Sequence, residues 1–314
     1  MKVGRRRRRR RWIAPGLVMV LVLAWALLGE GLRERLGLPG SGVVEKRGLS
    51  ALRLATWNLR NFPAEGQDLS RLQERLKELD ADVIAVQEVH DAEALRALMP
   101  GWELRLSEAG GRGGQRVGFL FDPEVMELVG APREHKELTM GGGVRPGFSG
   151  RLRPRAGGAD FSLLVVHLKA RAEGHDLREK QWVALAQVAG ALQREDPDLV
   201  VMGDFNATGA PGGAPEDELG ALDQSLGAVG LSRVRNAGGC SAYWDGPRRD
   251  AWQVPSLLDL VWVAGLSGAQ GLEARPLLHC ARHHCKTFRS TGKYPERDYA
   301  DLSDHCPVVV DVPR

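Results

Sequence analysis

The stretch that most constrains the fold runs from Val200 to Asn206 and changes abruptly from apolar to polar residues, VVMGDFN. Val, Val and Met suit a strand that is buried on both faces. Gly203 permits a tight exit and the close approach of a neighbouring backbone. We therefore expect a central strand whose end presents Asp204 and Asn206. An Asx-type turn, in which both side chains bond local backbone groups, explains this single stretch equally well.

The same change from apolar to polar residues recurs in five other strand-like runs. They are LRLATWN with Asn58, DVIAVQE with Glu88, FSLLVVH with His167, LLDLVWV with Asp259, and PVVVDV, which Ser303-Asp304-His305 precede. One such residue is weak evidence, because a single Glu or His at a strand end is usually solvated or bonded locally. Six together predict that several strand ends converge on one pocket that suits a hard cation.

These stretches, and their order along the chain, resemble the endonuclease/exonuclease/phosphatase superfamily, which includes deoxyribonuclease I. GDFN and SDH with an upstream QE form a specific combination, and the matches cover nearly everything from about Leu52 onward. The resemblance implies an α/β fold: a four-layered α/β sandwich of two mixed β-sheets packed face to face, with helices outside. The matching stretches are TWNLRNF at 56–62, ADVIAVQEVHDAEAL at 81–95, VHLKA at 166–170, VMGDFNA at 201–207, LLDLVWV at 257–263 and SDHCPV at 303–308.

Hydrolysis of a phosphodiester requires a cation or fixed donors near phosphorus, and a group that orients or deprotonates water behind it. We assign Glu88 as the principal metal ligand, with Asn58 and Asp304 completing or supporting the site. Carboxylate and amide oxygens suit Mg²⁺, which keeps several of its own waters. Mg²⁺ is therefore the expected cofactor, with Mn²⁺ as an alternative.

The resemblance also implies roles for the remaining polar residues. Asp204 would orient or deprotonate the attacking water, and Asn206 would donate to the phosphate. His305, oriented by Asp259, would bind a non-bridging oxygen or relay a proton. His167 would hold the phosphate from the other side, with Lys169 nearby as a candidate to stabilise the charge of the leaving group. Lys169 and Gln115 are the predicted substrate-binding residues.

The chain departs from deoxyribonuclease I at three positions. Gly113 and Gln115 stand where that enzyme has a Tyr and a Glu before its FLF strand, so the carboxylate partner of His167 is missing. A neutral amide does not raise the pKa of an imidazole as a carboxylate does, which weakens a general-acid role for His167. His90 replaces an Arg that touches DNA. These departures predict intact catalysis with altered substrate recognition.

The N-terminus carries a membrane signal. Seven arginines at 5–11 precede the uncharged apolar run 12–29. As a helix this run would reach about 27 Å, just enough for a bilayer core. The positive-inside rule predicts a cytoplasmic segment at 1–11, a signal anchor at 12–29 and a catalytic domain outside the cytoplasm. A cleaved signal peptide, which would leave a secreted domain, is the alternative because Ala24-Trp25-Ala26 resembles a cleavage site. A nucleic-acid-binding basic arm fits the apolar run poorly.

The remainder divides into a linker at 30–50 and one domain at 51–314. The whole chain has 43 basic residues (Lys and Arg) and 40 acidic residues (Asp and Glu). The first 50 residues hold 12 of the basic and 3 of the acidic residues, so the remainder has 31 basic and 37 acidic residues. The net charge of the domain is therefore about −6, which argues modestly against tight binding of DNA through a basic face. Leucine spacing predicts a helix at 70–79 with Ser70 as its cap, and the clearest helical pattern covers 179–195.

Four cysteines lie in the last quarter of the chain. Outside the cytoplasm an even number of cysteines usually pairs, and four allow three connectivities. HCARHHC at 279–285 offers a zinc site as an alternative, although its spacing fits no standard zinc motif. A disulfide bond at Cys306 would brace the pocket beside His305. The other three cysteines are Cys240, Cys280 and Cys285.

The sequence thus predicts a membrane-tethered or secreted, magnesium-dependent phosphodiesterase. We expect a monomer that acts as a nuclease on DNA or RNA. The same chemistry on a phospholipid headgroup or another small phosphoester is the first alternative. An inactive binding module is the second, although the polar set is complete.

The tether gives a direct test. If the segment 12–29 is retained, the full-length protein should sediment with membranes and resist alkaline extraction, because its apolar run stays in the bilayer. Recovery of a soluble product that begins near Leu27 would instead identify a signal peptide.

Overall fold

The computed structural model describes residues 51–158, 160–246, 250–266 and 268–313. The predicted cytoplasmic segment (1–11), anchor (12–29) and linker (30–50) lie outside the described residues. Among the helices of the described part, none combines the length and the apolar character that a membrane crossing requires.

The first large sheet has seven strands in the order β10-β14-β16-β1-β2-β4-β3. β1 pairs in parallel with β2 and antiparallel with β16, so the sheet is mixed. Its strands are β1 (Ala51–Phe62), β2 (Val83–Val89), β3 (Glu103–Leu106), β4 (Arg116–Phe121), β10 (Arg235–Asn236), β14 (Glu273–Pro276) and β16 (Val308–Pro313).

The second large sheet has six strands in the order β5-β6-β7-β8-β13-β9. It is also mixed, because β7 and β8 are parallel whereas β8 and β13 are antiparallel. Its strands are β5 (Met126–His135), β6 (Gly147–Pro154), β7 (Phe161–His167), β8 (Leu199–Asp204), β9 (Ser232–Arg233) and β13 (Asp259–Ala264).

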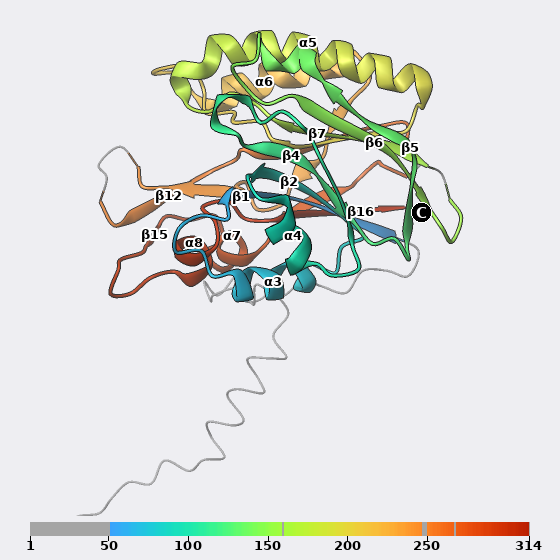
Figure 1. The fold of residues 1–314 in the computed structure, drawn as a ribbon. Helices are drawn as coiled ribbons and strands as arrows, with labels where there is room; N and C mark the ends of the chain where they lie inside the picture. The colour runs from blue at the N-terminus through green and yellow to red at the C-terminus, as the bar shows by residue number, and fades with distance from the viewer. Residues whose placement is uncertain (1–50, 159, 247–249, 267, 314) are drawn as a thin grey trace, which may run out of the picture. The chain divides into compact units, whose positions relative to one another are not determined.

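Three buried apolar clusters define the layers. One joins the inner faces of the two sheets and includes Leu54 of the first and Met202 of the second. Another joins the first sheet to α3 (Leu69–Glu78) and α4 (Ala92–Leu98), and the third joins the second sheet to α5 (His175–Glu195) and α6 (Pro215–Gly227). The helix pairs accordingly lie on opposite outer sides of the stacked sheets (Figure 1). The predicted arrangement of two mixed sheets with helices outside is confirmed.

Two helix boundaries differ from the predicted ones. The N-cap of α3 is Asp68, whose side chain accepts a hydrogen bond from the backbone N–H of Arg71, so the choice of Ser70 was wrong. α5 begins at His175, four residues before the predicted start at 179. α6 was not predicted, although Pro215 at its first turn and the acids that follow are typical start signals.

A smaller sheet of three strands, in the order β11-β12-β15, lies beside the two large ones. β12 and β15 project from one end of the stacked sheets, near α7 and α8 (Figure 1). The remaining elements are β11 (Ala242–Trp244), β12 (Trp252–Ser256), β15 (Phe288–Arg289), α7 (Leu278–Arg282), α8 (Arg297–Asp301) and three 3₁₀ turns, η1 (Gly111–Gly113), η2 (Lys136–Thr139) and η3 (Ala172–Gly174).

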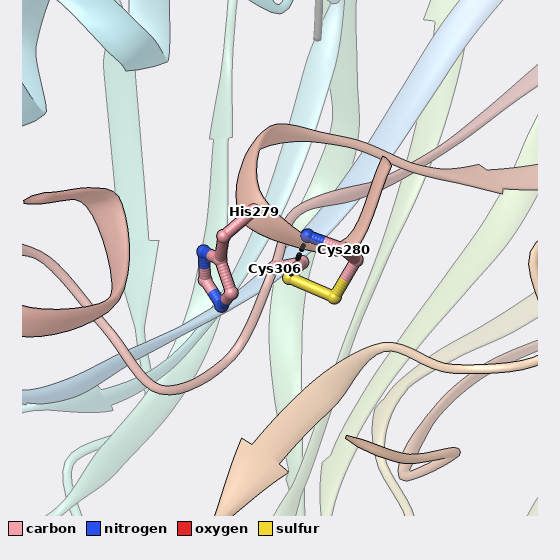
Figure 2. A group of neighbouring side chains, drawn as sticks. All are labelled: His279, Cys280 and Cys306. Atoms are coloured by element: carbon pink, nitrogen blue, oxygen red, sulfur yellow. Dashed lines mark hydrogen bonds between the residues drawn. A yellow bond between two sulfur atoms is a disulfide. The ribbon is translucent and has the colours of Figure 1, made fainter. Parts of the chain in front are cut away.

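All four cysteines form disulfide bonds, Cys240–Cys285 and Cys280–Cys306. Figure 2 shows His279 beside the second bond, the group of His and Cys side chains that could suggest a metal site. The sulfur atoms are bonded to each other, so they are not thiolate ligands. Burial lowers the pKa of His279 to about 4, and its ring packs against Tyr243. This segment is therefore a disulfide-braced core, and the zinc alternative finds no support.

Removing the Cys280–Cys306 bond should destabilise the domain. In a Cys280→Ser/Cys306→Ser double variant we expect the free energy of unfolding to fall by about 2–5 kcal/mol. Urea denaturation would measure this, with Cys240→Ser/Cys285→Ser as the matched control. The denatured, unreduced wild type should react with no thiol reagent. Free thiols, or stoichiometric zinc lost on mutating Cys280 and Cys285, would contradict this assignment.

Candidate active site

Three predicted residues lie in register at the same end of the second sheet. His167 pairs with Asp204 across β7 and β8, and Asp204 pairs with Asp259 across β8 and β13. Directly paired residues point to the same face of a sheet. Met202, two residues before Asp204, belongs to the core between the sheets, so this face looks toward the first sheet. The alternation of the strands thus brings the three side chains to one site.

Gly203 sets the spacing between two of these strands. Its φ is +140°, and a Cβ atom there would lie 2.0 Å from the carbonyl oxygen of Val166. No other residue tolerates this approach, so the expected role of Gly203 is confirmed. The Asx-type turn is present as well, because Asp204 Oδ1 accepts a hydrogen bond of 2.9 Å from the backbone N–H of Asn206. Only Asp204 Oδ2 faces the site.

Asn58 connects the two sheets at the site. It lies on β1 and donates from Nδ2 to Asp204 Oδ2 over 3.0 Å. Its backbone carbonyl accepts a hydrogen bond from Ser303 Oγ, which also accepts from the N–H of His305. Asn58 therefore fixes both the central carboxylate and the segment that carries His305.

Glu88 reaches the site through a local distortion of β2. Val83 and Ala85 face the core between the sheets, so strict alternation would point Glu88 outward. Its φ is +61°, unusual for a non-glycine residue, and the pairing of β2 with its neighbours shifts there. As a result Glu88 Oε1 lies 3.8 Å from His167 Nε2, and Oε2 accepts from the N–H of Asn61 over 2.8 Å.

His305 and Asp259 form a buried charged pair. His305 Nδ1 lies 2.8 Å from Asp259 Oδ2, and Nε2 lies 3.8 Å from Asp204 Oδ2. Burial disfavours the imidazolium, but the charges of Asp259 and Asp204 outweigh it and raise the pKa of His305 well above its ordinary value. The backbone carbonyl of His305 accepts from the indole N–H of Trp57, which holds the segment in place. His305 is therefore a protonated donor directed at Asp204.

The carboxylate of Asp204 is strongly perturbed by its surroundings. Burial raises the pKa of Asp204 to about 7; Asp259 and Glu88 act in the same direction, whereas His305 and the Asn58 hydrogen bond oppose it. A carboxylate whose pKa lies near neutral pH is well matched to general-base chemistry.

His167 has a different electrostatic setting. Its Nε2 lies 3.4 Å from Asp204 Oδ2, while Nδ1 has no hydrogen-bond partner among the described residues. Burial, Arg145 and His305 hold the pKa of His167 well below its ordinary value. His167 is thus a neutral imidazole that can donate one hydrogen bond, and no carboxylate orients its second nitrogen.

The structure adds Arg145, which was not among the predicted site residues and lies in the glycine-rich loop between η2 and β6. Its guanidinium donates to the carbonyl of Leu168 over 2.7 Å and to Gln115 Oε1 over 3.3 Å, and its buried Nε has no partner among the described residues. Burial lowers the pKa of Arg145, an effect that Asp204 and Glu88 oppose. An arginine stays protonated at neutral pH. This residue is a fixed cation at the site, and the clue in the sequence was only a Gly- and Arg-rich loop.

Gln115 lies beside Arg145. Its amide donates to Asn61 Oδ1 over 2.6 Å, and His90 Nε2 lies 3.3 Å from the same oxygen. Gln115 and the exposed His90 thus meet at Asn61 on the rim of the site.

Three further predicted residues are placed differently from the central group. Asn206 is buried, and its amide donates to the carbonyl of Leu168 over 3.3 Å. Lys169 is held through its backbone by Gln181 and Arg178, and its side chain packs beside Gly174. Within the described ranges, no hydrogen bond or ion pair joins the Asp304 carboxylate to Glu88 or Asn58, and its carbonyl accepts from the N–H of Tyr243. Their predicted roles remain predictions.

The donor set at this site fits a hard divalent cation. Glu88 Oε1 and Asp204 Oδ2 converge on His167 Nε2, and Asn58 joins them through Asp204. Burial raises the pKa of Asp204, and the nearby charges of Asp259 and Glu88 act in the same direction. Oxygen donors with excess negative charge are what Mg²⁺ prefers. Glu88 and Asn58 therefore suit the ligand role that the sequence predicted.

Comparison with solved structures supports the fold. The chain is similar to the human Nocturnin catalytic domain with bound sulfate, at 18% identity and a TM-score of 0.57, covering 85% of this chain and 95% of that one. It is similar to Danio rerio TDP2 complexed with a single-strand DNA product, at 14% identity and a TM-score of 0.59. That match covers 84% of this chain and 100% of the TDP2 chain. It is also similar to the mannosyl-6-phosphatase Bt3783 of Bacteroides thetaiotaomicron, at 18% identity and a TM-score of 0.55. That match covers 82% of this chain and 98% of the phosphatase.

No curated protein matches the chain. The sequence profile of the Endonuclease/Exonuclease/phosphatase family matches residues 55–305, which include every predicted site residue. This match agrees with the two mixed sheets and with the polar strand ends that meet between them. The chain therefore belongs to the endonuclease/exonuclease/phosphatase family, whose members are hydrolases of phosphoester bonds.

Proposed function

We propose that this chain is a divalent-metal-dependent phosphodiesterase that hydrolyses nucleic acid. The observation that carries the proposal is the setting of Asp204 Oδ2. Asn58 donates to it, His167 and the imidazole of the His305–Asp259 pair lie within 3.8 Å of it, and the pKa of Asp204 is raised to about 7. A near-neutral base beside a protonated imidazole is the pairing that attack of water on a phosphodiester needs.

Glu88 and Asn58, supported by Asp304, would hold Mg²⁺. When bound, the cation supplies charge stabilisation to the phosphate oxygens. Asp204 is placed to accept the proton of the attacking water, since its Oδ1 is held by the backbone and Oδ2 faces the site. The protonated His305 would donate to a non-bridging phosphate oxygen, and Asp259 would keep its ring oriented.

Arg145 and His167 would hold the phosphate from the opposite side. Arg145 adds a fixed positive charge whose Coulombic partners at the site are Asp204 and Glu88. The neutral His167 would act as a hydrogen-bond donor, because its low pKa opposes a role as a proton source. Leaving-group charge remains the proposed task of Lys169.

Nucleic acid is the substrate class that we favour. One structurally similar protein, Danio rerio TDP2, is described in complex with a single-strand DNA product, and that similarity supports the choice. We also propose that the domain acts outside the cytoplasm. The two disulfide bonds support this location, because such bonds persist mainly in oxidising compartments.

A panel of substrates tests the proposed function. The purified protein should cleave DNA or RNA in the presence of Mg²⁺ and lose this activity in a chelator, because the buried carboxylates need the cation. Plasmid DNA, a structured RNA and phospholipid vesicles would be incubated with and without the metal. Cleavage of phospholipid alone, or undiminished cleavage of nucleic acid in the chelator, would refute the proposal.

Glu88→Gln and Asp204→Asn should differ in their response to metal. Glu88→Gln removes a ligand charge at constant volume, so activity should fall and recover partly at high Mg²⁺. Asp204→Asn removes the group that positions or deprotonates water, so kcat should fall by about 10²- to 10⁴-fold without recovery. In His305→Ala, kcat should fall as in Asp204→Asn, without recovery at high Mg²⁺. In Asp259→Asn the fall in kcat should be smaller, because only the orientation of His305 is disturbed. Full activity in Asp204→Asn would exclude its assigned role.

A further inference from the structure

The three-stranded sheet β11-β12-β15 has one face buried in the domain. Tyr243 of β11, Gln253 of β12 and Phe288 of β15 are each at most 6% exposed. Gln253 pairs directly with Phe288, so their side chains share this face. Tyr243 and Phe288 pack against each other in the cluster that holds both disulfide bonds, and Tyr299 donates to Gln253. The inner face is therefore rigidly supported.

The opposite face carries two exposed indoles and a cation. Trp244 pairs with Val254, and Trp252, two residues from Val254 on the same strand, pairs with Arg289. Paired residues and residues two apart on a strand share a face, so all four lie on the outer side. Trp244 is 46% exposed, Trp252 is 50% exposed, and Arg289 is exposed. The described residues include five large exposed apolar side chains. Three of them, Trp244, Trp252 and Tyr294, lie between residues 244 and 294.

This outer face continues into the candidate active site. Ala242, two residues before Trp244, pairs with Ser256 and forms an isolated antiparallel bridge with His305. The side chain of His305 therefore points to the same side as Trp244 and Trp252. Two backbone hydrogen bonds flank the bridge, from Tyr243 to Asp304 over 2.9 Å and from Cys306 to Ser241 over 2.7 Å. The exposed indoles thus lie on the face of the small sheet toward which the side chain of His305 points.

We propose that this outer face, defined by Trp244, Trp252 and Arg289, binds unpaired bases of a single-stranded nucleic acid whose phosphate lies at Asp204 and His305. The inference rests on the proposed function and specifies its substrate. The two tryptophans are diagonal neighbours, about 7–8 Å apart at their Cα atoms, which leaves room for bases to stack on both rings. Stacking on aromatic side chains beside a basic residue is how proteins bind single strands with little sequence preference.

The same face explains how a domain with excess negative charge can bind a polyanion. Stacking uses the π-face of a base and needs little net positive charge. Arg289 adds a local cation, and the exposed Lys286 lies on the same segment. A membrane-facing surface would instead be expected to combine indoles with exposed aliphatic side chains. The large exposed aliphatic residues of the described chain are Leu69 on α3 and Val183 on α5, which belong to other layers.

The experiment measures binding separately from cleavage. In an Asp204→Asn background, full-length protein carrying Trp244→Ala or Trp252→Ala would be titrated against a labelled oligodeoxythymidine and against a duplex of equal length. Each alanine change should raise the Kd for the single strand by at least about 5-fold and leave the Kd for the duplex nearly unchanged. Trp244→Tyr and Trp252→Tyr should largely preserve binding, because an aromatic ring remains. Val183→Ala is the control for an exposed apolar side chain elsewhere.

Two further measurements keep the outcomes distinct. In the wild-type background, each tryptophan variant should hydrolyse bis(p-nitrophenyl) phosphate at the wild-type rate, which shows that the catalytic site is folded. Unchanged binding of the single strand, or equal losses for single strand and duplex, would overturn the inference and leave the proposed function standing. Loss of binding to phosphatidylglycerol vesicles, with oligonucleotide binding intact, would overturn it in favour of a membrane-facing surface. Failure of the wild type to cleave any nucleic acid would refute the proposed function itself.

Discussion

The structure depends on a carboxylate buried where two sheets meet. Asp204 ends the central strand of the second sheet, and its Oδ2 accepts a hydrogen bond from Asn58 of the first sheet. A buried charge without partners costs far more than one hydrogen bond returns, so the groups around Asp204 are constrained in number and position. Asn58, His305 and the backbone of Asn206 meet that requirement. The catalytic arrangement and the joint between the sheets are consequently the same feature.

Ordinary strand alternation assembles most of this site, and one distortion completes it. His167, Asp204 and Asp259 continue the inward-facing positions of their strands, so the residues that build the core also direct these side chains. Glu88 is out of phase and reaches the site through its positive φ. Such backbone strain persists only where the surroundings enforce it, and it is concentrated at functional sites. The position of Glu88, the predicted principal metal ligand, therefore depends on neighbours that hold its backbone.

The region that carries His305 is built differently from the sheets. Two disulfide bonds, short strands and a small aromatic cluster replace the large apolar layers there. This construction places His305 next to a narrow sheet whose outer face is free to carry exposed tryptophans. The inner face of the small sheet packs against the cluster that holds the disulfide bonds, whereas its outer face carries Trp244 and Trp252. The departures at Gln115 and His90 meet at Asn61 on the rim of the site.

The sequence by itself determined the strand ends and the central carboxylate, because apolar alternation and a few polar residues define them locally, and its resemblance to a known family implied the pairing of His305 with Asp259. It also indicated the layered α/β fold through its resemblance to a known family. Only the tertiary structure decided the connectivity of the cysteines, the arrival of Arg145 from a glycine-rich loop and the common face of Trp244, Trp252 and His305. Each of these depends on contacts between residues distant in the chain, for which local periodicity carries no signal. The turn of Glu88 into the site belongs with them, since a shifted strand register is fixed by pairing across the sheet and not by the strand's own residues.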